Sequence, residues 1–120
     1  CTWKEILVVC CVTRCGVDTH LPGFLTMASR QFFLGGNWKS NGNQALVKDL
    51  ASVIKREAKS NADIEKVIFP MALHLQSLVS SVDGKLCSVG AQMVSEYPKG
   101  AHTGDIYAHA LSDSGVKWVL

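Results

Sequence analysis

The sequence predicts an α/β fold in which short buried strands alternate with amphipathic helices. Short apolar runs recur along the chain and are separated by stretches whose apolar residues follow helical spacing. The strands lack a clean alternation of inward and outward residues, as expected for a sheet that helices cover. Regular alternation of strand and helix favours parallel strands joined by right-handed crossovers.

The first predicted strand spans residues 31–37. A helix follows over residues 44–59, where apolar residues recur at helical spacing, and Asn43 is suited to cap its start. The second strand, residues 66–69, is a short apolar run that Pro70 stops.

The rest of the chain continues the same alternation. It predicts a helix over residues 72–82 and a strand over residues 86–92. A loop over residues 93–104, a short helix over residues 106–114 and a strand over residues 116–120 follow. Gly115 is well placed to end the short helix in the left-handed conformation.

Composition excludes several classes of function. The 120 residues correspond to one small domain or part of a larger one, and the net charge of +2 comes from scattered basic residues, which does not suggest a nucleic-acid partner. We find no apolar run long enough to span a bilayer, so no membrane association is expected. Four of the five cysteines lie in the first fifteen residues without zinc spacing, and Cys87 is expected to be a packed core thiol.

Residues 1–29 differ in character from the body, residues 30–120, and we treat them as an N-terminal extension of unclear status. The segment could be a signal peptide, an organellar transit segment, or upstream sequence without a role if Met27 is the start. We favour the last interpretation because no periodicity links the segment to the body.

Asn37 and Lys39 are the strongest candidates for a functional site. Lysine supplies a positive charge with three donors, and asparagine supplies a neutral donor and acceptor. In parallel α/β folds, ligands bind at the carboxyl ends of the strands, where these two residues fall. The pattern therefore predicts a site for a negatively charged ligand, although Asn-x-Lys is also a common surface triplet.

Other constellations are weaker. His102, Asp105 and His109 could be imagined as metal ligands, but no further ligand spacing supports a metal site, and none is predicted. Asp105, His109 and Ser112 share one helical face, which lacks the strained turn and oxyanion hole of a hydrolytic triad.

Four ordered motifs resemble the N-terminal part of the triosephosphate isomerase family. The resemblance covers about residues 27–120 and rests on the segments Phe32–Lys39, Val89–Gln92, Gly100–Asp105 and Gly115–Leu120. It implies about three and a half strand–helix units of a TIM (β/α)8 barrel. It also implies a cytoplasmic glycolytic and gluconeogenic enzyme that interconverts dihydroxyacetone phosphate and D-glyceraldehyde 3-phosphate through an enediolate, without a cofactor.

The resemblance also implies roles for single residues. Asn37 matches the family's substrate-binding asparagine, and Lys39 matches the catalytic lysine that stabilises the substrate's negative charge. Thr103 matches the tip of a loop that enters the dimer interface, which implies a homodimer. Departures from the family pattern occur at Met71, at Met93 and at Tyr107; because Tyr107 replaces a common capping serine, Asp105 is expected to cap the last helix instead.

In the family, the electrophilic His and the general base Glu follow the strand that ends at Leu120. We therefore expect the 120-residue chain alone to lack isomerase activity, because proton abstraction needs a base within reach. The alternative is a non-catalytic truncated product that acts only through dimer-type contacts. Four strands cannot close a barrel, and both edges of the sheet are expected to be unpaired.

Overall fold

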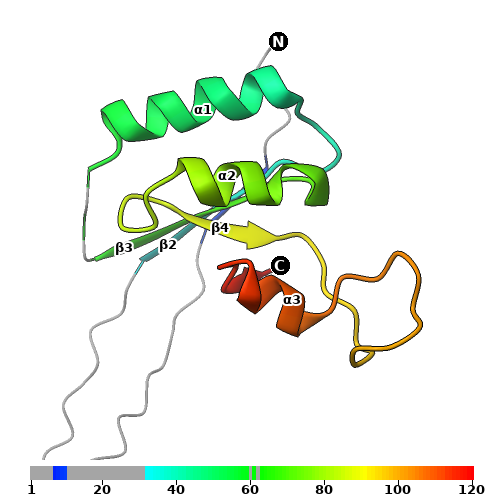
Figure 1. The fold of residues 1–120 in the computed structure, drawn as a ribbon. Helices are drawn as coiled ribbons and strands as arrows, with labels where there is room; N and C mark the ends of the chain where they lie inside the picture. The colour runs from blue at the N-terminus through cyan, green and yellow to red at the C-terminus, as the bar shows by residue number, and fades with distance from the viewer. Residues whose placement is uncertain (1–6, 11–31, 60, 62) are drawn as a thin grey trace, which may run out of the picture.

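A computed structural model of the chain describes residues 7–10, 32–59, 61 and 63–120 (Figure 1). Its sheet has five strands in sequential order: β1 (Leu7–Cys10), β2 (Phe32–Asn37), β3 (Ile64–Phe69), β4 (Ser88–Ala91) and β5 (Trp118–Val119). Strands β2 to β5 are parallel, which confirms the predicted fold class, and β1 pairs antiparallel with β2. β3 begins two residues earlier than the apolar run predicted.

The helices are α1 (Gln44–Glu57), a 3-10 turn η2 (Ala72–His74) continued by α2 (Leu75–Ser81), and α3 (Ala108–Asp113). Helices α1 and α2 lie side by side over the sheet (Figure 1). Asn43 caps α1 as predicted, because its Oδ1 accepts a hydrogen bond from the Leu46 amide at 2.9 Å. Gly115 adopts the left-handed conformation after α3, with φ of 82°, which also agrees with the prediction.

The start of α3 differs from the prediction. Tyr107 occupies the N-cap position and its side chain makes no capping hydrogen bond. Asp105 does not cap the helix, because its Oδ2 instead accepts a 2.8 Å hydrogen bond from the Ser95 hydroxyl. The prediction for Asp105 was therefore wrong, and this carboxylate closes the neck of the preceding loop.

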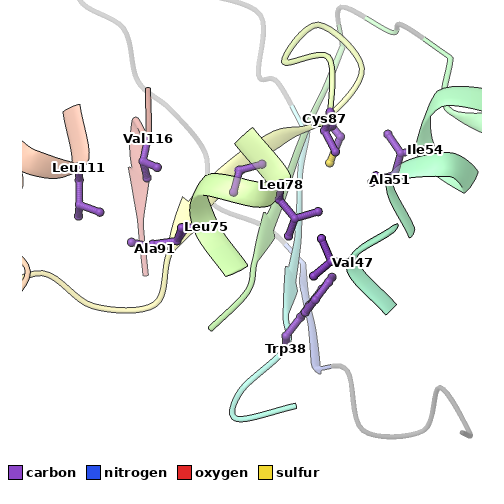
Figure 2. Close-up of a cluster of buried hydrophobic side chains, with 12 residues drawn as sticks. Trp38, Val47, Ala51, Ile54, Leu75, Leu78, Cys87, Ala91, Leu111 and Val116 are labelled. Atoms are coloured by element: carbon purple, nitrogen blue, oxygen red, sulfur yellow. The ribbon is translucent and has the colours of Figure 1, made fainter. Parts of the chain in front are cut away.

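A hydrophobic core fills the space between the sheet and the helices (Figure 2). Trp38 and Leu78 are its largest fully buried side chains, with 2% and 0% of their surfaces exposed. The rest of the core comes mainly from α1, α2, β4 and the residues around α3: Val47, Ala51, Ile54, Leu75, Val82, Cys87, Val89, Ala91, Leu111 and Val116. Burial of this apolar surface holds the helices on the sheet.

On the opposite face the sheet curls. The rings of Phe33 in β2 and Trp118 in β5 lie 5.3 Å apart between centroids, although β3 and β4 separate the two strands. Three strand spacings of a flat sheet would hold them about 14 Å apart. Gly90 permits this curvature, since a Cβ there would lie 2.4 Å from the Phe69 ring. The four parallel strands thus form a half-barrel whose concave face carries aromatic residues.

His74 is buried in the turn before α2, with 5% of its surface exposed. Neither Nδ1 nor Nε2 has a hydrogen-bond partner. Leaving buried polar atoms unpaired costs stability, whereas an apolar group of the same shape avoids that cost.

We therefore expect His74→Phe to leave the free energy of unfolding unchanged or to raise it by up to about 1 kcal/mol. Urea denaturation followed by circular dichroism measures the change. His74→Ala, which leaves a cavity, should instead destabilise the chain. A loss of more than about 2 kcal/mol in His74→Phe would show that the ring nitrogens have a polar partner in solution.

Cys87 is a buried free thiol immediately before β4, in keeping with the predicted core position of this thiol. Burial raises the pKa of the Cys87 thiol from 9.0 to about 11, and the nearby Lys66 partly opposes this shift. Between these values the unfolded chain loses the thiol proton and the folded chain keeps it, so stability must fall as pH rises.

Relative to Cys87→Ala, the native chain should therefore lose unfolding free energy between pH 8 and pH 10.5. Parallel urea titrations of both proteins at the two pH values measure this shift, and the alanine variant accounts for all other titrating groups. An unchanged difference would mean that the Cys87 thiol is accessible to water.

Candidate functional site

The candidate site lies at the carboxyl end of the sheet, where β2, β3 and β4 end. Asn37 is the last residue of β2, Phe69 is the last of β3, and Gln92 follows β4 directly. The Trp38 amide donates a 3.0 Å hydrogen bond to the Phe69 carbonyl and continues the β2–β3 pairing past the strand ends. Parallel strands therefore bring these residues to one mouth.

Asn37 and Lys39 lie together at this mouth, as predicted. Asn37 is nearly buried, with 9% of its surface exposed, and its Oδ1 accepts a 2.8 Å hydrogen bond from the Lys39 amide. The backbone angle φ of Lys39 is 54°, and within the described segments no other non-glycine residue has a positive φ. This left-handed conformation is unfavourable for a side chain with a Cβ and occurs often at functional sites.

Gln92 holds the backbone of Lys39 on its carbonyl side. Its Nε2 donates to the Lys39 carbonyl at 2.7 Å and to the Phe69 carbonyl at 2.9 Å. The amide and the carbonyl of Lys39 are thus both fixed by side chains, one from β2 and one from the end of β4. In the sequence, Gln92 stands out only as part of the Val89–Gln92 motif. Its place just after a strand, like that of Asn37, was the signal that could have identified it.

Replacing Gln92 by glutamate should destabilise this corner more than replacing it by leucine. A carboxylate cannot donate, and its oxygens would face the Lys39 and Phe69 carbonyl oxygens. We expect a loss of about 1–3 kcal/mol in unfolding free energy for Gln92→Glu at neutral pH, partly recovered at acidic pH as the carboxyl is protonated. Urea titrations at pH 4 and pH 7 measure this, and a pH-independent loss equal to that of Gln92→Leu would contradict the donor role.

A cavity of about 450 Å³ opens beside Lys39. Its polar lining comes from Lys39, Ser40 and Gln92. Its apolar lining comes from the end of β4 and from the loops and helices beside it: Met71, Ala72, Leu73, Leu75, Ala91, Met93 and Ile106. Met71 and Met93, two positions where the sequence was expected to depart from the family pattern, line this same cavity. Lys39 is exposed, and within the described residues no carboxylate forms an ion pair with it.

Thr103 is exposed on a loop that projects away from the sheet between β4 and α3 (Figure 1). The neck of the loop is closed by the Ser95 amide, which donates to the Ile106 carbonyl at 2.8 Å, and by the Ser95–Asp105 hydrogen bond. Near the tip, the His102 ring stacks on Tyr97 with centroids 4.9 Å apart. The structure does not bring Thr103 into the lining of the Lys39 cavity.

In the part of the chain that the structure describes, no three His, Cys, Asp or Glu side chains are grouped to hold a metal ion. His102 is engaged with Tyr97 in the loop, whereas His109 lies on α3. Over the same residues, none of the helices has the length and apolar character needed to cross a membrane.

A curled sheet of parallel strands that helices cover on one face, with an asparagine and a lysine at its carboxyl end, is part of a (β/α) barrel. Comparison with known proteins gives the particular family. The family model for triosephosphate isomerase matches residues 32–120, and the chain belongs to this family.

Curated relatives agree with this assignment. The chain is 38% identical over 92 residues to a triosephosphate isomerase of Marinobacter nauticus, covering 76% of this chain and 36% of the relative. It is 40% identical over 94 residues to one of Neurospora crassa, covering 77% and 37%. With one of Shewanella denitrificans it shares 37% identity over 101 residues, covering 78% and 38%. The chain thus spans somewhat more than a third of the length of these relatives.

Proposed function

We propose that this chain supplies the charge-stabilising part of a triosephosphate isomerase site. The reaction interconverts dihydroxyacetone phosphate and D-glyceraldehyde 3-phosphate through an enediolate, and its proposed setting is cytoplasmic glycolysis and gluconeogenesis. The observation that carries the proposal is Lys39: a lysine in a left-handed backbone conformation, fixed at its amide and its carbonyl, and placed at the mouth of the parallel strands.

The geometry suits an anionic substrate. The ammonium group of Lys39, a residue that lines the cavity, would stabilise the phosphate and the negative charge that develops on the enediolate oxygen. Because the Oδ1 of Asn37 already accepts from the Lys39 amide, the side-chain NH2 of Asn37 is left to donate to a substrate oxygen. Asn37 and Lys39 therefore act as a pair, in which one side chain orients the backbone of the other.

Proton transfer requires additional groups. Neither a carboxylate nor a histidine is among the described residues that line the cavity beside Lys39. Isomerisation needs a base within hydrogen-bond reach of the carbon-bound proton. We propose that the 120-residue chain binds and stabilises charge but does not turn over triose phosphate alone.

A second candidate function is a non-catalytic chain that acts through contacts with another subunit. The loop that carries Thr103 favours this alternative, because its neck is hydrogen-bonded while its tip is exposed. The same loop is proposed to form a homodimer contact in the complete protein.

A chimera separates the two functions. Residues 32–120 of this chain replace the matched segment in the Marinobacter nauticus triosephosphate isomerase, and a coupled dehydrogenase assay measures turnover. Isomerase activity in the folded chimera supports the first function. A chimera with a native-like circular dichroism spectrum but no turnover would overturn it and favour the non-catalytic alternative.

A further inference from the structure

Strand β1 lies on the outer edge of β2, on the side away from β3. The two strands are antiparallel, with Leu7 opposite Asn37, Val8 opposite Gly36, Val9 opposite Gly35 and Cys10 opposite Leu34. Residues 7–10 fall outside the segment that matches the triosephosphate isomerase family. Both edges of the sheet were expected to be unpaired, and for the β2 edge this prediction was wrong.

The direction of the β2 amides shows how the edge is used. Phe32 donates its amide to the Asp63 carbonyl and Trp38 donates to the Phe69 carbonyl, both on the β3 side. Amide directions alternate along a strand, so Gly35 and Asn37 direct their amides toward β1. In the observed register, Val9 and Leu7 then form the hydrogen-bonded pairs with these residues, while Val8 directs its amide away from β2.

A closed barrel requires the same edge. Every strand of a (β/α)8 barrel pairs on both sides, and the first parallel strand therefore pairs with the last. In this chain the first parallel strand is β2, and β1 already occupies the edge that the last strand would need. The two pairings use the same amides and carbonyls and exclude each other.

We propose that residues 7–10 form an edge-capping strand that competes with closure of the barrel. While β1 is bound, the backbone beside Gly35 and Asn37 is satisfied, and the edge cannot template another strand. A closing strand, from whichever polypeptide carries it, must displace β1 first. Since Leu7 lies opposite Asn37, this displacement exposes the backbone next to the candidate site.

Two proline variants of the 120-residue chain test the occupied edge. Val9→Pro removes an amide that faces β2, whereas Val8→Pro removes one that faces away and serves as the matched control. Hydrogen exchange at Gly35 and Asn37 should be slow in the native chain and in Val8→Pro, and at least about tenfold faster in Val9→Pro. Unchanged protection of the β3 amides in all three proteins confirms that the rest of the sheet is intact.

The competition is tested by adding the part of the Marinobacter nauticus enzyme that follows its matched segment. Val9→Pro should associate with this polypeptide roughly tenfold more tightly than the native chain and Val8→Pro, because its edge is already free. Sedimentation velocity measures the association. Equal affinity of the three proteins, absence of association with any of them, or equal hydrogen exchange at Gly35 in both variants would overturn the proposal.

Discussion

Lys39→Met is expected to lower the kcat/KM of the chimeric isomerase by about 100- to 1000-fold, the range seen when a single charge-stabilising donor is removed from an active site. Methionine has nearly the length of lysine and also carries a Cβ, so it meets the same left-handed backbone at residue 39. What the substitution removes is the ammonium group at the cavity edge. The coupled dehydrogenase assay used for the parent chimera measures the loss.

Lys39→Arg provides the control for charge alone. Arginine keeps the positive charge but carries it on a planar group with a different reach, so it should recover only a small part of the activity. If Lys39→Met kept kcat/KM within about threefold of the parent, the charge at residue 39 would not stabilise the transition state, and the role that we assign to it would be wrong.

The sequence predicted the parts of this site that depend on strand order. Apolar runs alternating with helical spacing placed Asn37 and Lys39 at the carboxyl end of a parallel strand, and the structure has them there. Local chemistry predicted the Asn43 cap and the left-handed Gly115 equally well. Each of these features depends on residues close together in the chain, where spacing carries the information.

Features that depend on distant contacts were not predictable in this way. Gln92 reaches the Lys39 carbonyl across 53 residues of sequence, and no local pattern reports such a contact. Asp105 was expected to cap α3, but a hydroxyl ten residues earlier competed for its carboxylate. The β1–β2 pairing joins segments with no shared periodicity. It was not predictable because backbone hydrogen bonds place little demand on side-chain identity.

Trp38→Ala is expected to have the largest effect on stability, about 3–5 kcal/mol of unfolding free energy, as found for large buried aromatic residues. Trp38 is 2% exposed and belongs to the core between α1 and the sheet (Figure 2). Gly42 passes close over its ring, since a Cβ on Gly42 would lie 3.0 Å from Trp38 Cε3. A whole small domain is stable by only about 5–15 kcal/mol, so this one change removes a large share.

The same residue links the core to the candidate site. Trp38 stands between Asn37 and Lys39, and its amide bonds to the Phe69 carbonyl, which also accepts from Gln92. The cavity that replaces the ring should therefore loosen the Lys39 backbone that Asn37 and Gln92 hold, in addition to weakening the core. Urea denaturation measures the stability loss, and hydrogen exchange of the Lys39 amide measures the loosening. Trp38→Phe, which keeps most of the buried ring, should cost clearly less on both measures; equal losses in the two variants would mean that the volume of the Trp38 ring does not support the site.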